Sequence, residues 1–131
     1  MATAPCQRSR MTPDSRYASD MEQVVVKDLG SPDRSQDFLD GSHRDVVVLR
    51  SVVMGRGVYR PGWRWSAHAG PLEGGPSSGH VGYIVSGRMG IRGPDGKETS
   101  VGPGEGFEAA KGHDAWMVGD EPCVALDFGA I

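Results

Sequence analysis

Short apolar runs, rich in β-branched residues and separated by turn residues, recur from residue 24 to the end of the chain. Such runs occupy residues 24–26, 46–49, 52–54, 81–85, 89–91, 116–118 and 123–128. The segments between them, such as GSPD, DGSH, GPGEG and GDEP, carry the Gly, Pro and Asp of tight turns. GPDGK, residues 93–97, holds an Asp-Gly pair that predicts a hairpin. We expect at most one helical turn, in residues 33–41, and therefore an all-β sandwich or small barrel.

Length and composition predict one domain with a tail. The chain has 131 residues, enough for a single hydrophobic core. Its 20 glycines and 9 prolines are spread along the chain between apolar runs, as in a turn-dense β-protein. Residues 1–22 lack a hydrophobic period, and we interpret them as a flexible tail before a domain of residues 23–131. An arm exchanged with a partner subunit is the alternative interpretation.

Charge and hydropathy argue against several classes of partner. The formal net charge is −3 with both signs interspersed, so no basic face for nucleic acid is expected. No apolar run approaches the length of a membrane span, and the N-terminus lacks the apolar stretch of a secretory signal. We therefore expect a cytoplasmic protein with no membrane partner. The two cysteines, Cys6 and Cys123, are expected to be free thiols, and no CxxC spacing points to a thiolate metal site.

Residues 80–113, HVGYIVSGRMGIRGPDGKETSVGPGEGFEAAKGH, resemble the two linked motifs of the cupins. Gly87 stands at the hairpin glycine of the first motif, VGPGEG resembles the turn that opens the second motif, and Gly112-His113 closes it. The resemblance covers about residues 45–128, and the segments PGWRWS and GHDAWMVGDEP further resemble a subgroup of small single-domain bacterial cupins. It implies a jelly-roll β-barrel and a divalent metal ion.

The motifs differ from the cupin pattern at four positions. His80 stands where the first motif usually has Glu, and His68 alone represents the usual His-x-His pair. In the second motif Ala110 replaces a proline, and His113 follows its glycine directly. Between His68 and His80 lies a stretched loop, in which Glu73 is available as a substitute ligand.

Three of the four histidines lie in or beside these motifs, and we predict that His68, His80 and His113 bind one divalent metal ion. Neutral imidazoles suit Fe(II), which we expect, with Zn, Ni or Mn as alternatives. An incomplete protein ligand set leaves positions for water or substrate. The competing interpretation makes His68 and His113 loop residues bonded to backbone, with no metal in the barrel.

Strand alternation offers a catalytic carboxylate. Side chains alternate across a strand, so His80 shares a face with Gly82, beside which we expect interior room. Glu108 points inside, and is expected to move protons, if Phe107 faces outward. Alternation alone leaves open which of the two faces the core.

Further side chains near the motifs are assigned smaller roles. Arg64 shares strand parity with His68 and is expected to bind a substrate carboxylate if residues 63–68 stay extended. Asp114 either orients His113 or caps a turn. Trp63 and Trp65 are expected in the core or at a dimer interface.

The predicted function is that of a small metal-dependent enzyme acting on a small chelating organic substrate. Dioxygenase, isomerase or cyclase, and decarboxylase chemistry all suit a mononuclear site with open positions. The alternative is a non-catalytic module that binds a small ligand. A homodimer is expected, because pairing would shield the edge strands of an open barrel.

Overall fold

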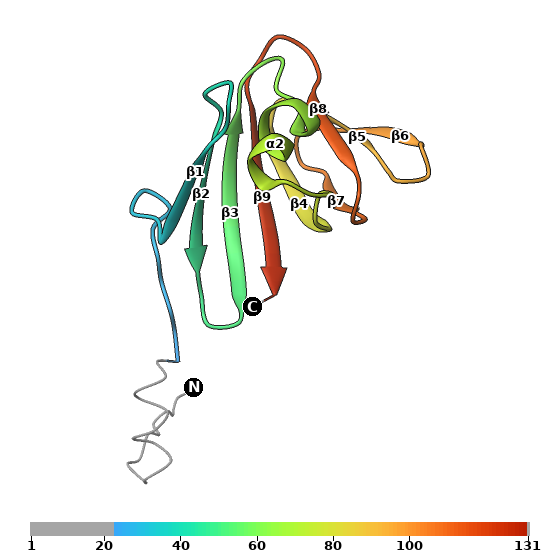
Figure 1. Ribbon diagram of the computed structural model, residues 1–131. Coiled ribbons are helices and arrows are strands. Elements are labelled where there is room, and N and C mark those ends of the chain that lie inside the picture. Colours follow the sequence, from blue (N-terminus) through green and yellow to red (C-terminus); the bar gives the residue numbers. More distant parts are fainter. Residues whose placement is uncertain (1–22, 131) are drawn as a thin grey trace, which may run out of the picture.

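The computed structural model describes residues 23–130, and it folds them into two antiparallel sheets (Figure 1). The predicted tail, residues 1–22, and Cys6 lie outside the described residues. The larger sheet has the order β1-β2-β3-β9-β4-β7 and the smaller one the order β6-β5-β8. The all-β prediction is confirmed. The strands are β1 (Arg34–Asp37), β2 (His43–Val48), β3 (Val52–Tyr59), β4 (His80–Ser86), β5 (Met89–Arg92), β6 (Glu98–Val101), β7 (Gly106–Ala109), β8 (Asp114–Met117) and β9 (Cys123–Ala130).

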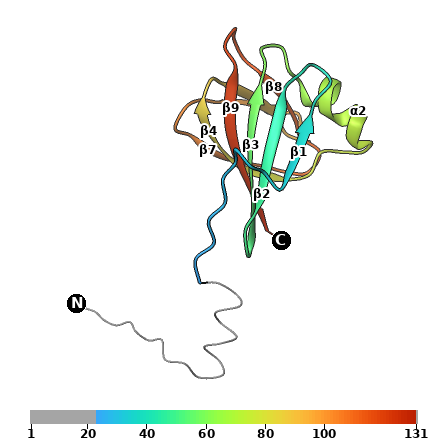
Figure 2. The same cartoon turned by 90° about the vertical axis from the view of Figure 1, so that its left-hand side faces the viewer.

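The larger sheet is built around its two longest strands. β3 and β9 pair over their full length, from Val52 opposite Ala130 to Tyr59 opposite Cys123. In Figure 2 this sheet faces the viewer, with β8 of the smaller sheet behind it. The core lies between the sheets, where Ile84 and Cys123 have no exposed surface. Burial raises the pKa of the Cys123 thiol to about 11, so this cysteine is an inert core residue.

Two predicted turns are confirmed by the backbone. Residues 93–97 close the β5–β6 hairpin: Gly96 has φ +87°, the Gly93 N–H donates to the Lys97 carbonyl, and the Gly96 N–H donates to the Gly93 carbonyl. Gly87 joins β4 to β5 at φ +79°, a conformation that residues with a Cβ rarely adopt.

Three segments differ from the expectation. Residues 24–26 form no strand, because they pair with no neighbour; Val24 and Val26 are 76% and 86% exposed. Residues 34–37 form the edge strand β1 instead of a helical turn, since pairing with β2 outweighs their weak apolar pattern. β6 and β7 have no apolar run of their own, but β6 is the second strand of the hairpin expected at residues 93–97, and β7 lies where strand alternation was expected around Phe107 and Glu108.

The third difference is helical. Trp65–Ala69 form a π-helical turn that continues into the short helix α2 (Gly70–Glu73). Pro71 lies in the first turn of α2, and Gly74 ends it at φ +74°. No helix within residues 23–130 has the length and apolar character needed to cross a membrane.

One surface histidine predicts a pH-dependent stability. His43 contacts Asp37 and Asp45 at 2.6 Å each, and these hydrogen bonds raise its pKa above 6.5. The resulting stabilisation is complete below the unfolded-state pKa and is lost as the pH rises through the folded-state pKa. We expect His43→Gln to lower the free energy of unfolding at about pH 5.5 and to have less effect at about pH 8.5. Urea unfolding at both pH values measures this, and an equal loss at both would contradict it.

Candidate functional site

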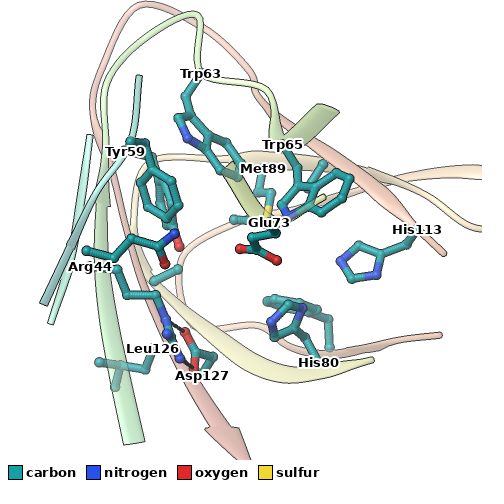
Figure 3. A pocket seen from close by; sticks show the side chains of 15 residues that line it. Arg44, Tyr59, Trp63, Trp65, Glu73, His80, Met89, His113, Leu126 and Asp127 are labelled. Carbon is teal, nitrogen blue, oxygen red and sulfur yellow. Dashed lines mark hydrogen bonds and ion pairs between the residues drawn. The ribbon is translucent and has the colours of Figure 1, made fainter. Parts of the chain in front are cut away.

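A cavity of about 90 Å³ lies between the two sheets (Figure 3). One wall carries two imidazoles, from His80 and His113, and the opposite wall carries Arg44, Asp127 and Tyr59. Glu73 of α2 is exposed and also lines the cavity, so the opening to solvent lies beside it. Aromatic and aliphatic side chains fill the space between the polar walls, among them Trp63, Trp65, Met89 and Phe107.

The structure brings His80 and His113 together. Their ring centroids are 5.3 Å apart and the rings are nearly perpendicular, at 86°. His80 begins β4 and pairs with Ala109, on the inner face of the sheet. Burial lowers the pKa of His80, so its imidazole is neutral near pH 7 and has a lone pair to offer.

His113 is buried and held in one orientation. It is 6% exposed and lies in the turn between β7 and β8. Its Nδ1–H donates to the carbonyl oxygen of Ala110 at 2.9 Å, with the buried Ser77 hydroxyl 3.3 Å away. This bond fixes the tautomer and leaves Nε2 as the acceptor, the arrangement that supports a metal-binding or proton-accepting histidine.

His68 is not part of this pair. It does not line the cavity, and its Nδ1 accepts a hydrogen bond from the backbone N–H of Arg64 at 3.0 Å. The expected set of three metal-binding histidines is therefore corrected to two. The helical turn at Trp65–Ala69 directs the His68 side chain toward the backbone of the preceding residues and away from the cavity. Both His68 and His113 are bonded to backbone, as the competing interpretation had it, but only His113 also lines the cavity.

Arg64 and Asp114 also lie outside the cavity. The segment turns helical at Trp65 instead of staying extended to His68, which removes the condition under which Arg64 was expected to bind substrate. Its guanidinium contacts Asp114 at 3.1 Å and lies 4.7 Å from the ring centroid of Trp116. Asp114 accepts hydrogen bonds from Ser66 rather than from His113, so its role is to anchor the helical turn to β8.

Glu108 faces away from the cavity, which corrects its expected role as an inward carboxylate. It is exposed, whereas the neighbouring Phe107 lines the cavity. Gly82 explains why Phe107 and not Glu108 faces inward. It lies opposite Phe107, and a Cβ at this position would be 2.5 Å from the Phe107 ring, so the ring needs the space that glycine leaves. The room expected beside His80 is thus filled by an aromatic ring.

The opposite wall was missed by sequence reasoning. Arg44 of β2 and Asp127 of β9 form a two-bond ion pair, with Nε to Oδ2 at 2.9 Å and Nη2 to Oδ1 at 2.5 Å. Both side chains are partly buried, at 25% and 17% exposed. The sequence did carry a signal that these two residues face inward. In the alternation of their strands, Arg44 shares a face with Val46, and Asp127 shares a face with Cys123 and Ala125, all of which are apolar and buried.

The two imidazoles fit a divalent metal ion. Two rings bound to one ion through nitrogens at about 2.1 Å would have centroids roughly 5 Å apart, close to the spacing of His80 and His113. A third donor is not in place: within residues 23–130 no three His, Cys, Asp or Glu side chains are grouped to hold an ion. Two carboxylates line the cavity, Glu73 and Asp127, and Asp127 is paired with Arg44. Glu73 points into the cavity and is therefore the carboxylate that could supply the third ligand (Figure 3).

Comparison with known proteins identifies the fold. No family model matches the sequence, and no curated protein matches it. Among solved structures, the polyketide cyclase RemF from Streptomyces resistomycificus is 16% identical with a TM-score of 0.58, covering 82% of this chain and 80% of its own. KdgF from a Halomonas species is 20% identical with a TM-score of 0.53, covering 72% and 84% respectively.

A third solved structure carries the name of the fold. An RmlC-like cupin from Shewanella frigidimarina is 14% identical with a TM-score of 0.53, covering 74% of this chain and 82% of its own. At these identities the likeness concerns the backbone arrangement alone. Together with the two antiparallel sheets and the Gly87 hairpin, it confirms the resemblance seen in the sequence: the chain has the cupin fold.

Proposed function

We propose that this chain is a small metal-dependent enzyme that binds one divalent ion through His80 and His113 and acts on a small organic molecule in the cavity. The observation that carries the proposal is the adjacent pair of imidazoles in the cavity wall, from the half-buried His80 and the buried His113, of which His113 is held in a fixed tautomer. When bound, the ion supplies Lewis acidity or, if ferrous, activates dioxygen. The residues of the chain orient the molecule and exclude water around it.

Glu73 completes the proposed ligand set. Two imidazoles and one carboxylate form the facial set that favours Fe(II), with positions left open for substrate. Glu73 ends α2, whose four residues are all exposed or half-buried, so the helix lacks a buried anchor. An inward shift of α2 would bring the carboxylate toward the histidines and would also narrow the mouth of the cavity. Zn, Ni and Mn remain the alternative ions.

Metal content tests this proposal. Protein purified without added metal is analysed for bound ions, alongside His80→Ala, His113→Ala and His68→Ala. We expect metal affinity to fall by more than about tenfold in the first two variants, because each loses a direct ligand. His68→Ala is the matched control and should keep its metal, since His68 lies outside the cavity. Loss of metal in His68→Ala, or full retention in His80→Ala, would contradict the proposal.

The alternative is a module that binds a small ligand without turning it over. It uses the same cavity, and it differs in having no reaction once metal and ligand are both present. Oxygen uptake by the Fe(II)-loaded protein on addition of a diketone would support the enzyme. Retention of the diketone without oxygen uptake or conversion would support the binding module.

The homodimer stays a prediction, and the outer face of β4 is where we expect it. Val81, Tyr83 and Val85 alternate on this face and are 46%, 41% and 47% exposed. Across β9 the apolar surface continues through Phe128 and Leu126, which lie opposite Val81 and Tyr83. Such a contiguous apolar face is typical of an interface between copies.

Light scattering at high protein concentration tests the dimer. Tyr83→Asp places a charge in the middle of this outer face and is expected to yield a monomer. Val118→Asp changes an exposed valine in the turn after β8 and should leave the dimer intact. A monomeric wild-type protein would contradict the prediction.

A further inference from the structure

The wall opposite the histidines is a built polar surface. The side chains of Arg44 and Asp127 meet across β3, the strand that separates β2 from β9. They meet directly over Gly55, where a Cβ would lie 2.6 Å from Nη2 of Arg44 and 2.7 Å from Oδ1 of Asp127. A glycine at this position is therefore what allows the ion pair to lie flat against the sheet and face the cavity.

A second glycine accommodates Tyr59 in the same way. A Cβ on Gly57 would lie 2.3 Å from the Tyr59 ring and its hydroxyl oxygen. Tyr59 is 8% exposed and lines the cavity beside the ion pair (Figure 3). Burial raises the pKa of its phenol, so the hydroxyl keeps its proton and can donate it in a hydrogen bond.

This wall has more hydrogen-bond donors than acceptors. Each carboxylate oxygen of Asp127 accepts one hydrogen bond from Arg44, Oδ2 from Nε and Oδ1 from Nη2. Among the hydrogen bonds within residues 23–130, none involves Nη1 of Arg44 or the hydroxyl of Tyr59. The adjoining Trp63 has a buried Nε1 that also lacks a partner in that part of the chain. Donors left over in a partly dry site favour a ligand that brings an acceptor oxygen.

The charges around the cavity argue that this ligand is neutral. Arg44 is the only Arg or Lys among the lining residues, and Asp127 balances its charge at close contact. The carboxylate of Glu73 adds a further negative charge at the mouth. A carboxylate ligand entering the metal-free cavity would meet net negative charge in a region of reduced dielectric constant.

We propose that the donor wall of Arg44 and Tyr59 selects an uncharged carbonyl compound with a flat apolar body. This proposal rests on the proposed function, whose substrate class it names. The carbonyl oxygen accepts hydrogen bonds from Nη1 of Arg44 and from the Tyr59 hydroxyl. The apolar body lies between Trp65 and Phe107, and it directs the other end of the molecule toward His80 and His113. Arg44 alone would favour a negatively charged ligand. Asp127 neutralises the charge of Arg44, so the remaining donors favour a neutral acceptor.

Matched probes test this selection in chelator-treated, metal-free protein. Acetophenone and benzoate have nearly the same size and shape, and they differ in carrying a ketone or a carboxylate. We expect NMR titration of the wild-type protein to show tighter binding of acetophenone. Asp127→Asn keeps the shape of the side chain and an acceptor for Arg44 but removes one negative charge. We expect it to raise the affinity for benzoate by about tenfold or more, with a small effect on acetophenone.

The control variant carries the same change of net charge outside the cavity. Asp45 is on β2 next to Arg44 but faces the outer surface, and Asp45→Asn should leave both probes unaffected. Stronger binding of benzoate than of acetophenone by the wild-type protein would overturn the proposal. So would an unchanged ratio of affinities in Asp127→Asn, or an equal response in Asp45→Asn.

The outcome is separate from that of the metal test. If the protein holds no metal but prefers acetophenone, the carbonyl site stands and the metal-dependent function fails. If the histidine variants lose metal but benzoate binds more tightly than acetophenone, the metal site stands and the neutral carbonyl class fails.

Discussion

Replacing Gly87 with alanine is expected to destabilise the fold by on the order of 3 kcal/mol, through two costs at one position. The residue has φ +79°, which an L-residue adopts at a cost of about 1–2 kcal/mol. A Cβ there would also lie 2.5 Å from the Pro122 carbonyl oxygen and 2.6 Å from Cα of Cys123. Both contacts are backbone atoms at the start of β9, so relief requires a shift of the central strand.

Gly96→Ala is the matched control for this prediction. Gly96 has a similar φ of +87° in the β5–β6 hairpin, but no atom lies within 4 Å of its would-be Cβ. Only the conformational cost remains, about 1–2 kcal/mol. Urea unfolding of both variants separates the two costs, and similar losses for Gly87→Ala and Gly96→Ala would show that the contact with β9 contributes nothing.

Removing Asp127 is expected to cost about 3 kcal/mol of unfolding free energy, because Arg44 is left charged and unpaired in the cavity wall. The value belongs at the low end for buried pairs, since both side chains retain some exposure. Replacing both residues, as Arg44→Met with Asp127→Leu, should recover most of the loss. A double-mutant cycle by urea unfolding measures this coupling.

Arg56→Met provides the comparison on the outer face of the same sheet. Arg56 lies 3.7 Å from Asp45 and is 37% exposed, so its loss should cost under about 1 kcal/mol. An Asp127→Leu variant as stable as Arg56→Met, or a double variant no more stable than Asp127→Leu, would contradict the cost assigned to an unpaired Arg44.

Much of the fold follows from local pattern. The runs around residues 46–49, 81–85 and 123–128 are β-branched or apolar, and they became β2, β4 and β9. Asp95-Gly96 produced the expected hairpin because its backbone needs are local. The edge strand β1, with the sequence RSQD, was missed because its formation depends on pairing with β2 and not on its own residues.

The site was harder to predict because it depends on contacts between distant residues. Alternation grouped His80 with Gly82 on one face, but it could not decide whether Phe107 or Glu108 faces the core, because that depends on Gly82 lying opposite Phe107 on the neighbouring strand. Arg44 and Asp127 are separated by 83 positions, so only the sheet order brings them together. His68 was misplaced because a helical turn replaced the expected extended segment.

Counting the imidazoles on a bound ion tests the central claim most directly. Cu²⁺ bound to the purified protein reports its nitrogen ligands by electron spin echo spectroscopy, without any need for the natural substrate. We expect two imidazole ligands in the wild-type protein and in His68→Ala, and one in either His80→Ala or His113→Ala. Three imidazoles in the wild type that fall to two in His68→Ala would contradict it, as would a wild-type protein that binds no Cu²⁺.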